Sequence, residues 1–140
     1  MKTYSDLQAI DTRLTCHIHL EPVGHPDVSV IAGPHLAGGI LYRDLDIQVG
    51  LDLQQPFVIQ IQLQNKIYTA DSETAVHIRS IQIDGQDLVP RFLGLAHYDN
   101  DHGFKNPTDY LGFNGKWTLT IDRPFYHWLH EHTGQGWLLG

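Results

Sequence analysis

Short segments in which apolar and polar residues alternate strictly run through the chain, and they constrain its fold more than any other feature. Between Phe57 and Leu63 every second residue is large and apolar. Residues 12–20 alternate in the same way, with one apolar set formed by Leu14, Cys16, Ile18 and Leu20. A period of two is that of a β-strand with one buried face, because successive side chains of a strand point to opposite sides.

Further strands are predicted by the same pattern and by the turn signals between them. We expect strands over residues 28–32, 40–53, 74–83, 88–93, 110–113 and 116–121, and a turn-rich connection over 33–39. The apolar phase slips near Arg79–Ser80, which predicts a β-bulge. Asp84-Gly85 and Asn114-Gly115 are hairpin turn signals, and the second is the stronger. The strands follow one another at intervals of about ten residues, as in all-β sandwiches.

The composition agrees with a β fold. Val, Ile, Thr and the aromatic residues make up nearly a third of the 140 residues, whereas Ala, Glu and Lys are few. Helical signals are confined to Ser5–Ile10 and to residues 127–130. The sequence therefore predicts one domain over residues 1–140, an all-β protein with little or no helix. Its expected architecture is a two-sheet antiparallel β-sandwich of jelly-roll type.

Charge and hydropathy exclude several classes of partner. The net charge is −7 with histidine neutral, and the nine Lys and Arg residues are scattered, so we expect no nucleic-acid partner. No stretch approaches the length of an apolar membrane span, so no membrane partner is expected. The N-terminal residues lack the apolar core of a signal peptide, which predicts synthesis in the cytoplasm. The single cysteine, Cys16, lies on the apolar side of its strand and is expected to be a buried, inert thiol.

Two groups of side chains are candidates for metal binding. His17, His19 and Glu21 share one strand face, a spacing that metal-binding jelly rolls use, and they would support a cupin-like metal-dependent enzyme. Their apolar neighbours point the other way, however, which favours a solvent-exposed face. Asp99 and Asp101 flank an asparagine, an arrangement that suits calcium, although a plain surface loop explains the same residues.

Aromatic and amide side chains in the second half of the chain favour ligand binding. Flat rings for stacking and amides or carboxylates for hydrogen bonds are what sugar recognition needs. No nucleophile motif or phosphate-binding glycine loop is present, which argues against catalysis. The candidate ligand-binding residues are Tyr98, Asn100, Tyr110, Asn114, Tyr126 and Trp128.

Residues 57–139 resemble small β-sandwich proteins encoded by tailed phages. The resemblance is carried by Asn65-Lys66-Ile67-Tyr68, Glu73-Thr74-Ala75-Val76, Ile83-Asp84-Gly85, Tyr110-Leu111-Gly112-Phe113-Asn114-Gly115, Pro124-Phe125-Tyr126 and Thr133-Gly134-Gln135-Gly136-Trp137-Leu138-Leu139. Such proteins are similar in architecture to carbohydrate-binding modules. The resemblance implies association with a phage virion or tail.

The favoured hypothesis is thus a non-catalytic binding or structural module. Its expected partners are a glycan or other virion subunits, and calcium is its candidate cofactor. Sheet edges and the apolar segment Trp137–Leu139 further predict a homo-oligomer. The alternative is the cupin-like enzyme.

Overall fold

The computed structural model describes residues 13–52, 54–69, 73–89 and 91–133. The predicted helical segment Ser5–Ile10 and the apolar segment Trp137–Leu139 lie outside the described residues. In chain order the strands are β1 (Arg13–Val23), β2 (Asp27–Ala32), β3 (His35–Ile40), β4 (Leu45–Asp52), β5 (Phe57–Gln64), β6 (Ala75–Ile83), β7 (Gln86–Val89), β8 (His97–Asn100), β9 (Tyr110–Leu111) and β10 (Gly115–Ile121). A 3₁₀ turn, η1 (Leu93–Leu95), precedes β8, and helix α2 (Phe125–Thr133) follows β10.

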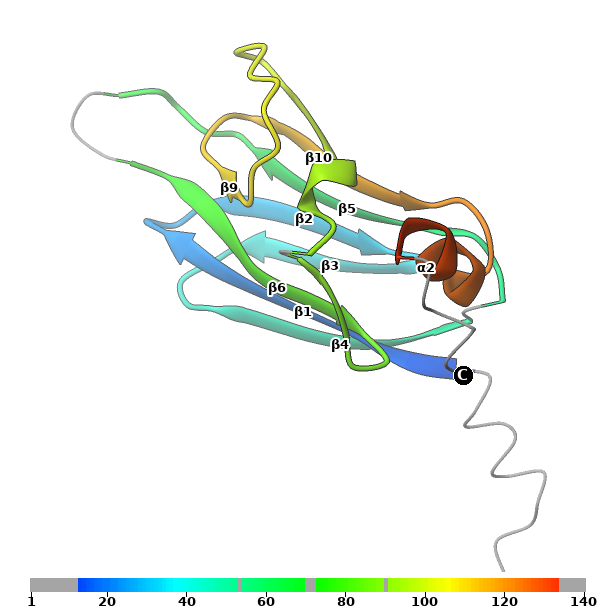
Figure 1. Ribbon diagram of the computed structural model, residues 1–140. Coiled ribbons are helices and arrows are strands. Elements are labelled where there is room, and N and C mark those ends of the chain that lie inside the picture. Colours follow the sequence, from blue (N-terminus) through cyan, green and yellow to red (C-terminus); the bar gives the residue numbers. More distant parts are fainter. Residues whose placement is uncertain (1–12, 53, 70–72, 90, 134–140) are drawn as a thin grey trace, which may run out of the picture.

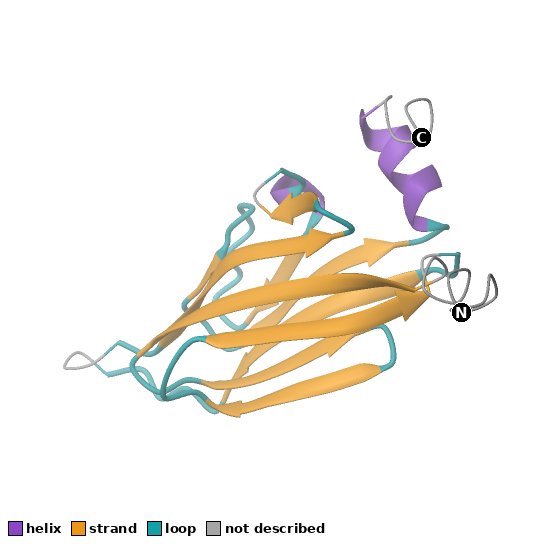
Figure 2. Cartoon of the chain, turned by 90° about the horizontal axis from the view of Figure 1, so that it is seen from below, coloured by secondary structure: helices purple, strands orange, loops and turns teal. Residues whose placement is uncertain are grey.

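The strands form two antiparallel sheets that pack face to face (Figures 1 and 2). The first sheet has the order β4-β1-β6-β7, and β9 pairs with β6 beside it. The second has the order β3-β2-β5-β10-β8. The connection between β5 and β6 lies at one end of the sandwich, and α2 lies at the other (Figure 1). The prediction of a two-sheet antiparallel β-sandwich with little helix is confirmed.

The core lies between the sheets and follows the alternation in the sequence. In β5 the four large apolar residues are buried, whereas Val58 is exposed. In β6, which lies in the opposing sheet, the alternation is interrupted at Arg79. This residue is an extra one in the pairing with β1, where the register shifts between His19 and Leu20. This is the predicted bulge, and it lets both Ile78 and Ile81 face the core. Cys16 is buried as predicted, and burial raises the pKa of its thiol to about 12.

One turn prediction is confirmed and one is wrong. Asp84 and Gly85 both have positive φ, 51° and 75°, and join β6 to β7 as a tight hairpin. Asn114-Gly115 does not form a hairpin: β9 pairs with β6 in the first sheet, whereas β10 pairs with β5 and β8 in the second. The chain therefore crosses from the first sheet to the second at this point. The Asn114 side chain bonds the backbone of Lys66, in the connection that follows β5.

Several predicted element limits differ from the structure: the strands predicted at 40–53 and 88–93 correspond to β4 (Leu45–Asp52) and β7 (Gln86–Val89). Residues 35–40 form an edge strand, β3, rather than a turn, because they pair with β2. Gly38 and Gly39 have positive φ, 127° and 123°, which glycine adopts readily. Residues 97–100 form β8, since pairing with β10 overrides the polar composition of that segment. The helical signal at 127–130 belongs to the longer α2. No helix in the described part of the chain is both long and apolar enough to span a membrane.

Candidate functional site

Two loop segments enclose a pocket at the end of the sandwich opposite α2. One is the connection that follows β5, and the other runs from β8 through β9 to β10. The pocket has a volume of about 560 Å³. Five aromatic rings contribute to its wall, together with one lysine, one glutamate, two threonines and a glycine. The lining residues are Lys66, Tyr68, Thr69, Glu73, Tyr98, Phe104, Thr108, Tyr110, Gly112 and Phe113.

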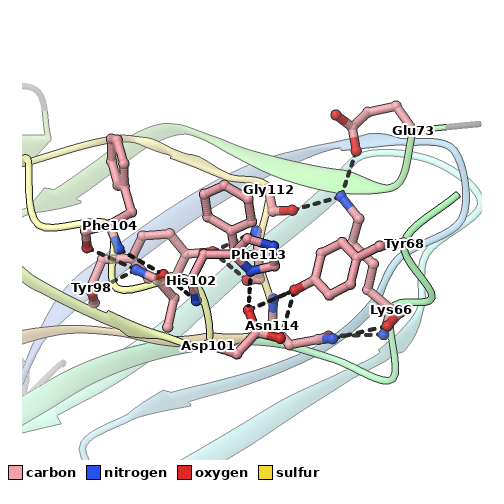
Figure 3. A network of polar contacts seen from close by, with 11 residues as sticks. Lys66, Tyr68, Glu73, Tyr98, Asp101, His102, Phe104, Gly112, Phe113 and Asn114 are labelled. Carbon is pink, nitrogen blue, oxygen red and sulfur yellow. Dashed lines mark hydrogen bonds and ion pairs between the residues drawn. The ribbon is translucent and has the colours of Figure 1, made fainter. Parts of the chain in front are cut away.

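Asn114 fixes the β5–β6 connection against the second loop segment. Its Oδ1 accepts the Lys66 backbone N–H at 2.8 Å, and its Nδ2 donates to the Lys66 carbonyl at 2.9 Å. Asn65, the preceding residue, has φ of 60° and donates its amide to Asp27 at 2.8 Å. The left-handed backbone at Asn65 and the two-point contact at Lys66 set the direction in which the Lys66 side chain leaves the chain (Figure 3).

Lys66 places a nearly buried ammonium group in the pocket wall. Its side chain is 5% exposed. Nζ donates to Glu73 Oε1 at 2.5 Å and to the Gly112 carbonyl at 2.6 Å, and it lies 5.3 Å from the centre of the Tyr68 ring. The hydrogen bond from Lys66 lowers the pKa of Glu73, so this carboxylate is ionised at neutral pH.

A second polar cluster holds the Tyr68 ring. The Tyr68 hydroxyl donates to Asp101 Oδ1 and Oδ2 at 2.7 and 2.8 Å, and it accepts the Asn114 backbone N–H at 2.8 Å. His102 Nδ1 lies 2.7 Å from Asp101 Oδ1. The imidazole of His102 stacks on Phe113, with ring centres 4.2 Å apart, and meets the edge of Tyr68 at 4.6 Å (Figure 3). The imidazole of His102 therefore contacts two rings of the pocket wall, those of Phe113 and Tyr68.

Tyr98 and Asn100 shape the second loop segment. The Tyr98 hydroxyl donates to the Phe113 carbonyl and accepts the Phe113 N–H at 2.9 Å, and burial raises the pKa of this hydroxyl to about 12. Asn100 Nδ2 donates to the carbonyls of Tyr98 and Phe104, while its Oδ1 accepts the N–H groups of His102 and Phe104. All four bonds join the Asn100 side chain to backbone groups of the same loop segment, so Asn100 stabilises the conformation of that segment.

The Asp101 cluster predicts a pH dependence of stability. The hydrogen bond to His102, and then that to Tyr68, lower the pKa of Asp101 in the folded chain. A lowered folded-state pKa stabilises the fold above the unfolded-state pKa of about 3.9, and the contribution is lost as pH falls through the folded value. We expect Asp101→Asn to melt below wild type at pH 7, with the difference shrinking from about pH 5 downward. Thermal melts at pH 7, 5 and 3 measure it, and a difference that is constant across this range would contradict the assignment.

The structure brings together some of the predicted ligand-binding residues and separates others. Tyr98 and Tyr110 line the pocket, and Asn100 and Asn114 position its walls. Tyr126 and Trp128 lie on α2, at the opposite end of the sandwich. Trp128 is 2% exposed and packs on Phe92 and Phe125, with ring centres 5.0 and 6.2 Å apart. Trp128 is thus a core residue and offers no free ring face to a ligand.

The predicted metal ligands do not converge. His17 and His19 share the outer face of β1 as expected, but they pair separately with Asp46 at 2.9 Å and Asp44 at 2.8 Å. Glu21 lies instead near His77, at 3.9 Å. These pairings leave the cupin-like hypothesis without a shared ligand set in the described part of the chain.

Asp99 and Asp101, the predicted calcium ligands, have other neighbours in the structure. Both Asp101 oxygens accept the Tyr68 hydroxyl, and Asp99 stands opposite Lys116 in the β8–β10 pairing. Across the described ranges, no three His, Cys, Asp or Glu side chains are grouped so that they could hold a metal ion.

Sequence reasoning missed most of the pocket wall. Lys66, Tyr68, Glu73, Phe104 and Phe113 line the pocket but were not among the candidate residues. An available signal was the long connection between β5 and β6, with a lysine, a tyrosine and a glutamate in it, because loops on a rigid scaffold carry binding residues. The pairing of this loop with residues 101–114 could not be read from either segment alone.

A second pocket of about 550 Å³ lies between the β2–β3 turn and the β4–β5 connection. Its lining is Gly33, Pro34, His35, Gly50, Leu51, Asp52, Gln55, Pro56, Phe57 and Val58. Among these lining residues Phe57 is the one Phe, Tyr or Trp, and its side chain is buried in the core. The first pocket, with three partly exposed rings, is therefore the candidate site.

Comparison with known proteins supports the architecture. No model of a protein family matches the sequence, and no curated protein matches it. The chain is similar in structure to the carbohydrate-binding module vCBM60 in complex with galactobiose, with a TM-score of 0.52, 15% identity, and coverage of 76% of this chain and 97% of that one. A selenomethionine form of vCBM60, from work on two families of calcium-dependent carbohydrate-binding modules, gives a TM-score of 0.52 at 14% identity and covers 77% of this chain and 92% of that one. The chain thus shares the β-sandwich architecture of a carbohydrate-binding module.

Proposed function

We propose that this chain is a non-catalytic carbohydrate-binding module and that the pocket between the β5–β6 connection and residues 98–113 is its binding site. The observation that carries the proposal is the gathering of five aromatic rings and a Lys–Glu pair around one open pocket. Pyranose rings have apolar C–H faces and a rim of hydroxyl groups. Aromatic faces with a few fixed polar groups complement both.

Three of the rings have free surface. The residues Tyr68, Tyr110 and Phe104 are 43%, 40% and 36% exposed, although each is a large hydrophobic side chain. Hydrogen bonds fix the hydroxyl of Tyr68, and Asn100 fixes the backbone that bears Phe104. Side chains that are already ordered lose little entropy when a ligand stacks on them, which favours binding.

The wall of this pocket also argues for binding rather than catalysis. Glycoside hydrolysis uses a pair of carboxyl groups across the scissile bond. Among the described residues that line the pocket, Glu73 alone carries a carboxylate, and Lys66 binds it. The architecture shared with vCBM60 supports the same proposal, because that protein binds galactobiose in its solved complex.

The proposal predicts that removing an exposed pocket ring weakens glycan binding. Tyr110→Ala is expected to weaken binding by at least about fivefold, since stacking of a sugar on an aromatic ring is worth about 1 kcal/mol or more. The matched control is Tyr42→Ala, because Tyr42 is 71% exposed but does not line the pocket. Isothermal titration with glycans selected from an array measures both variants. Equal loss in the two variants, or wild-type protein that binds no glycan, would contradict the proposal.

Three earlier expectations stay predictions. Association with a phage virion or tail and homo-oligomerisation rest on the sequence alone. Calcium stays a candidate cofactor: one of the similar structures comes from work on calcium-dependent carbohydrate-binding modules, although Asp101 is bonded to Tyr68 and lies next to His102 in this chain.

A further inference from the structure

We infer that Lys66 recognises the carboxylate of an acidic sugar, such as a uronic acid, and that Glu73 occupies that position while the pocket is empty. The inference deepens the proposed function and rests on it. It starts from an asymmetry in one ion pair: the Lys66 side chain is 5% exposed, whereas the Glu73 side chain is 54% exposed. The cation is part of the pocket wall, and its anion lies at the surface.

Groups other than Glu73 also hold the Lys66 side chain in place. Asn114 holds the Lys66 backbone through both its N–H and its carbonyl, and the Gly112 carbonyl accepts one Nζ–H bond at 2.6 Å. The alkyl stem is buried with the rest of the side chain. A desolvated ammonium needs an anionic partner, because a buried charge without one is costly. The wall therefore presents a fixed site for one carboxylate.

Glu73 is a replaceable occupant of that site. Its Oε1 accepts Lys66 Nζ at 2.5 Å and the Thr74 backbone N–H at 3.0 Å. If a ligand carboxylate replaces it on Lys66, one ammonium–carboxylate pair is exchanged for another, and Glu73 turns into water. The exchange has a small net electrostatic cost, so stacking of the sugar on Tyr68 and Tyr110 can favour the bound state.

The charge of the wall agrees with an anionic ligand although the whole chain is acidic. Among the described residues that line the pocket, Lys66 and Glu73 are the charged ones, so this part of the wall carries one positive charge once Glu73 turns outward. The nearby Asp101 is engaged by the Tyr68 hydroxyl and by His102. A volume of about 560 Å³ is within the range of small-ligand pockets, about 300–1,000 Å³.

Ligand pairs that differ only in the carboxylate test the inference. Oligosaccharides of galacturonate, glucuronate and mannuronate are titrated by calorimetry against wild-type protein, each beside its neutral methyl ester. We expect at least one acid to bind at least about tenfold more tightly than its ester. Lys66→Met, which keeps the alkyl stem without the charge, is expected to remove that preference.

Glu73→Ala gives the opposite expectation and does not depend on the folding of the Lys66 variant. Removing the internal competitor is expected to tighten binding of the acid several-fold and to leave the ester unchanged. Asp87→Ala is the control for net charge, because Asp87 is exposed and lies on β7, which pairs with the other end of β6. It is expected to change neither affinity.

The outcomes separate the inference from the proposed function. If neutral glycans bind and Tyr110→Ala weakens their binding, but no acid binds more tightly than its ester, the inference is overturned and the proposed function stands. An unchanged acid affinity in Glu73→Ala would overturn the inference as well. If the protein binds neither acids, esters nor any glycan of an array, both fail.

Discussion

Replacing Trp117 with alanine is expected to lower the free energy of unfolding by about 3–5 kcal/mol, the largest stability effect that the described core predicts. Trp117 is 1% exposed and lies in β10, between β5 and β8 in the second sheet. It is the largest of the fully buried side chains, so its removal leaves a large cavity among well-packed neighbours. Chemical denaturation measures the change. A loss below about 1 kcal/mol would contradict the packing described here.

Trp117→Phe separates the packing of the ring from its hydrogen bond. The indole Nε1 donates to the Thr108 carbonyl at 3.0 Å, and Thr108 lines the pocket. Phenylalanine keeps an aromatic ring but leaves this carbonyl without its donor, which is expected to cost about 1–3 kcal/mol. Thr120→Ala, at an exposed position of the same strand, is the control and is expected to change stability by less than about 0.5 kcal/mol.

Replacing Asn114 with alanine is expected to weaken glycan binding by at least about tenfold, because the β5–β6 connection loses its two-point anchor. The Lys66 N–H and carbonyl would both lose their partner, at a cost of about 1–3 kcal/mol for each buried group left unpaired. Titration calorimetry measures the affinity, and circular dichroism checks that the β-sheet signal persists.

Two further variants sharpen this prediction. Asn114→Asp keeps an oxygen for the Lys66 N–H but loses the donor to the carbonyl, so an intermediate affinity is expected. Asn106→Ala, in an exposed part of the same loop segment, is the control and is expected to bind as wild type does. Wild-type affinity in Asn114→Ala would show that the anchor does not position the site.

The strands with one buried face could be predicted from the sequence, because burial imposes the period of two. β5 and β1 follow that pattern nearly to their ends, and the bulge at Arg79 was visible as a phase slip. β3 was missed because its glycines were interpreted as turn residues, and β8 because its composition is polar. Pairing with a neighbouring strand, which no local pattern encodes, determines both.

The candidate site was only partly predictable, for a related physical reason. Tyr98 and Tyr110 were recognised as rings near polar residues, but ring type does not distinguish a pocket wall from the core, and Trp128 belongs to the core. Asn114 was predicted both as a ligand-binding residue and as part of an Asn-Gly turn, whereas its side chain bonds Lys66, 48 residues earlier. Contacts at that separation depend on how the two sheets pack.

Titration of ¹⁵N-labelled wild-type protein with its tightest-binding oligosaccharide, followed by NMR, tests the central claim most directly. Binding in the pocket predicts that the largest amide shifts occur at Lys66, Tyr68, Tyr110 and Gly112, from both loop segments, while α2 is unaffected. Shifts centred on α2 or on the outer face of either sheet would contradict the claim.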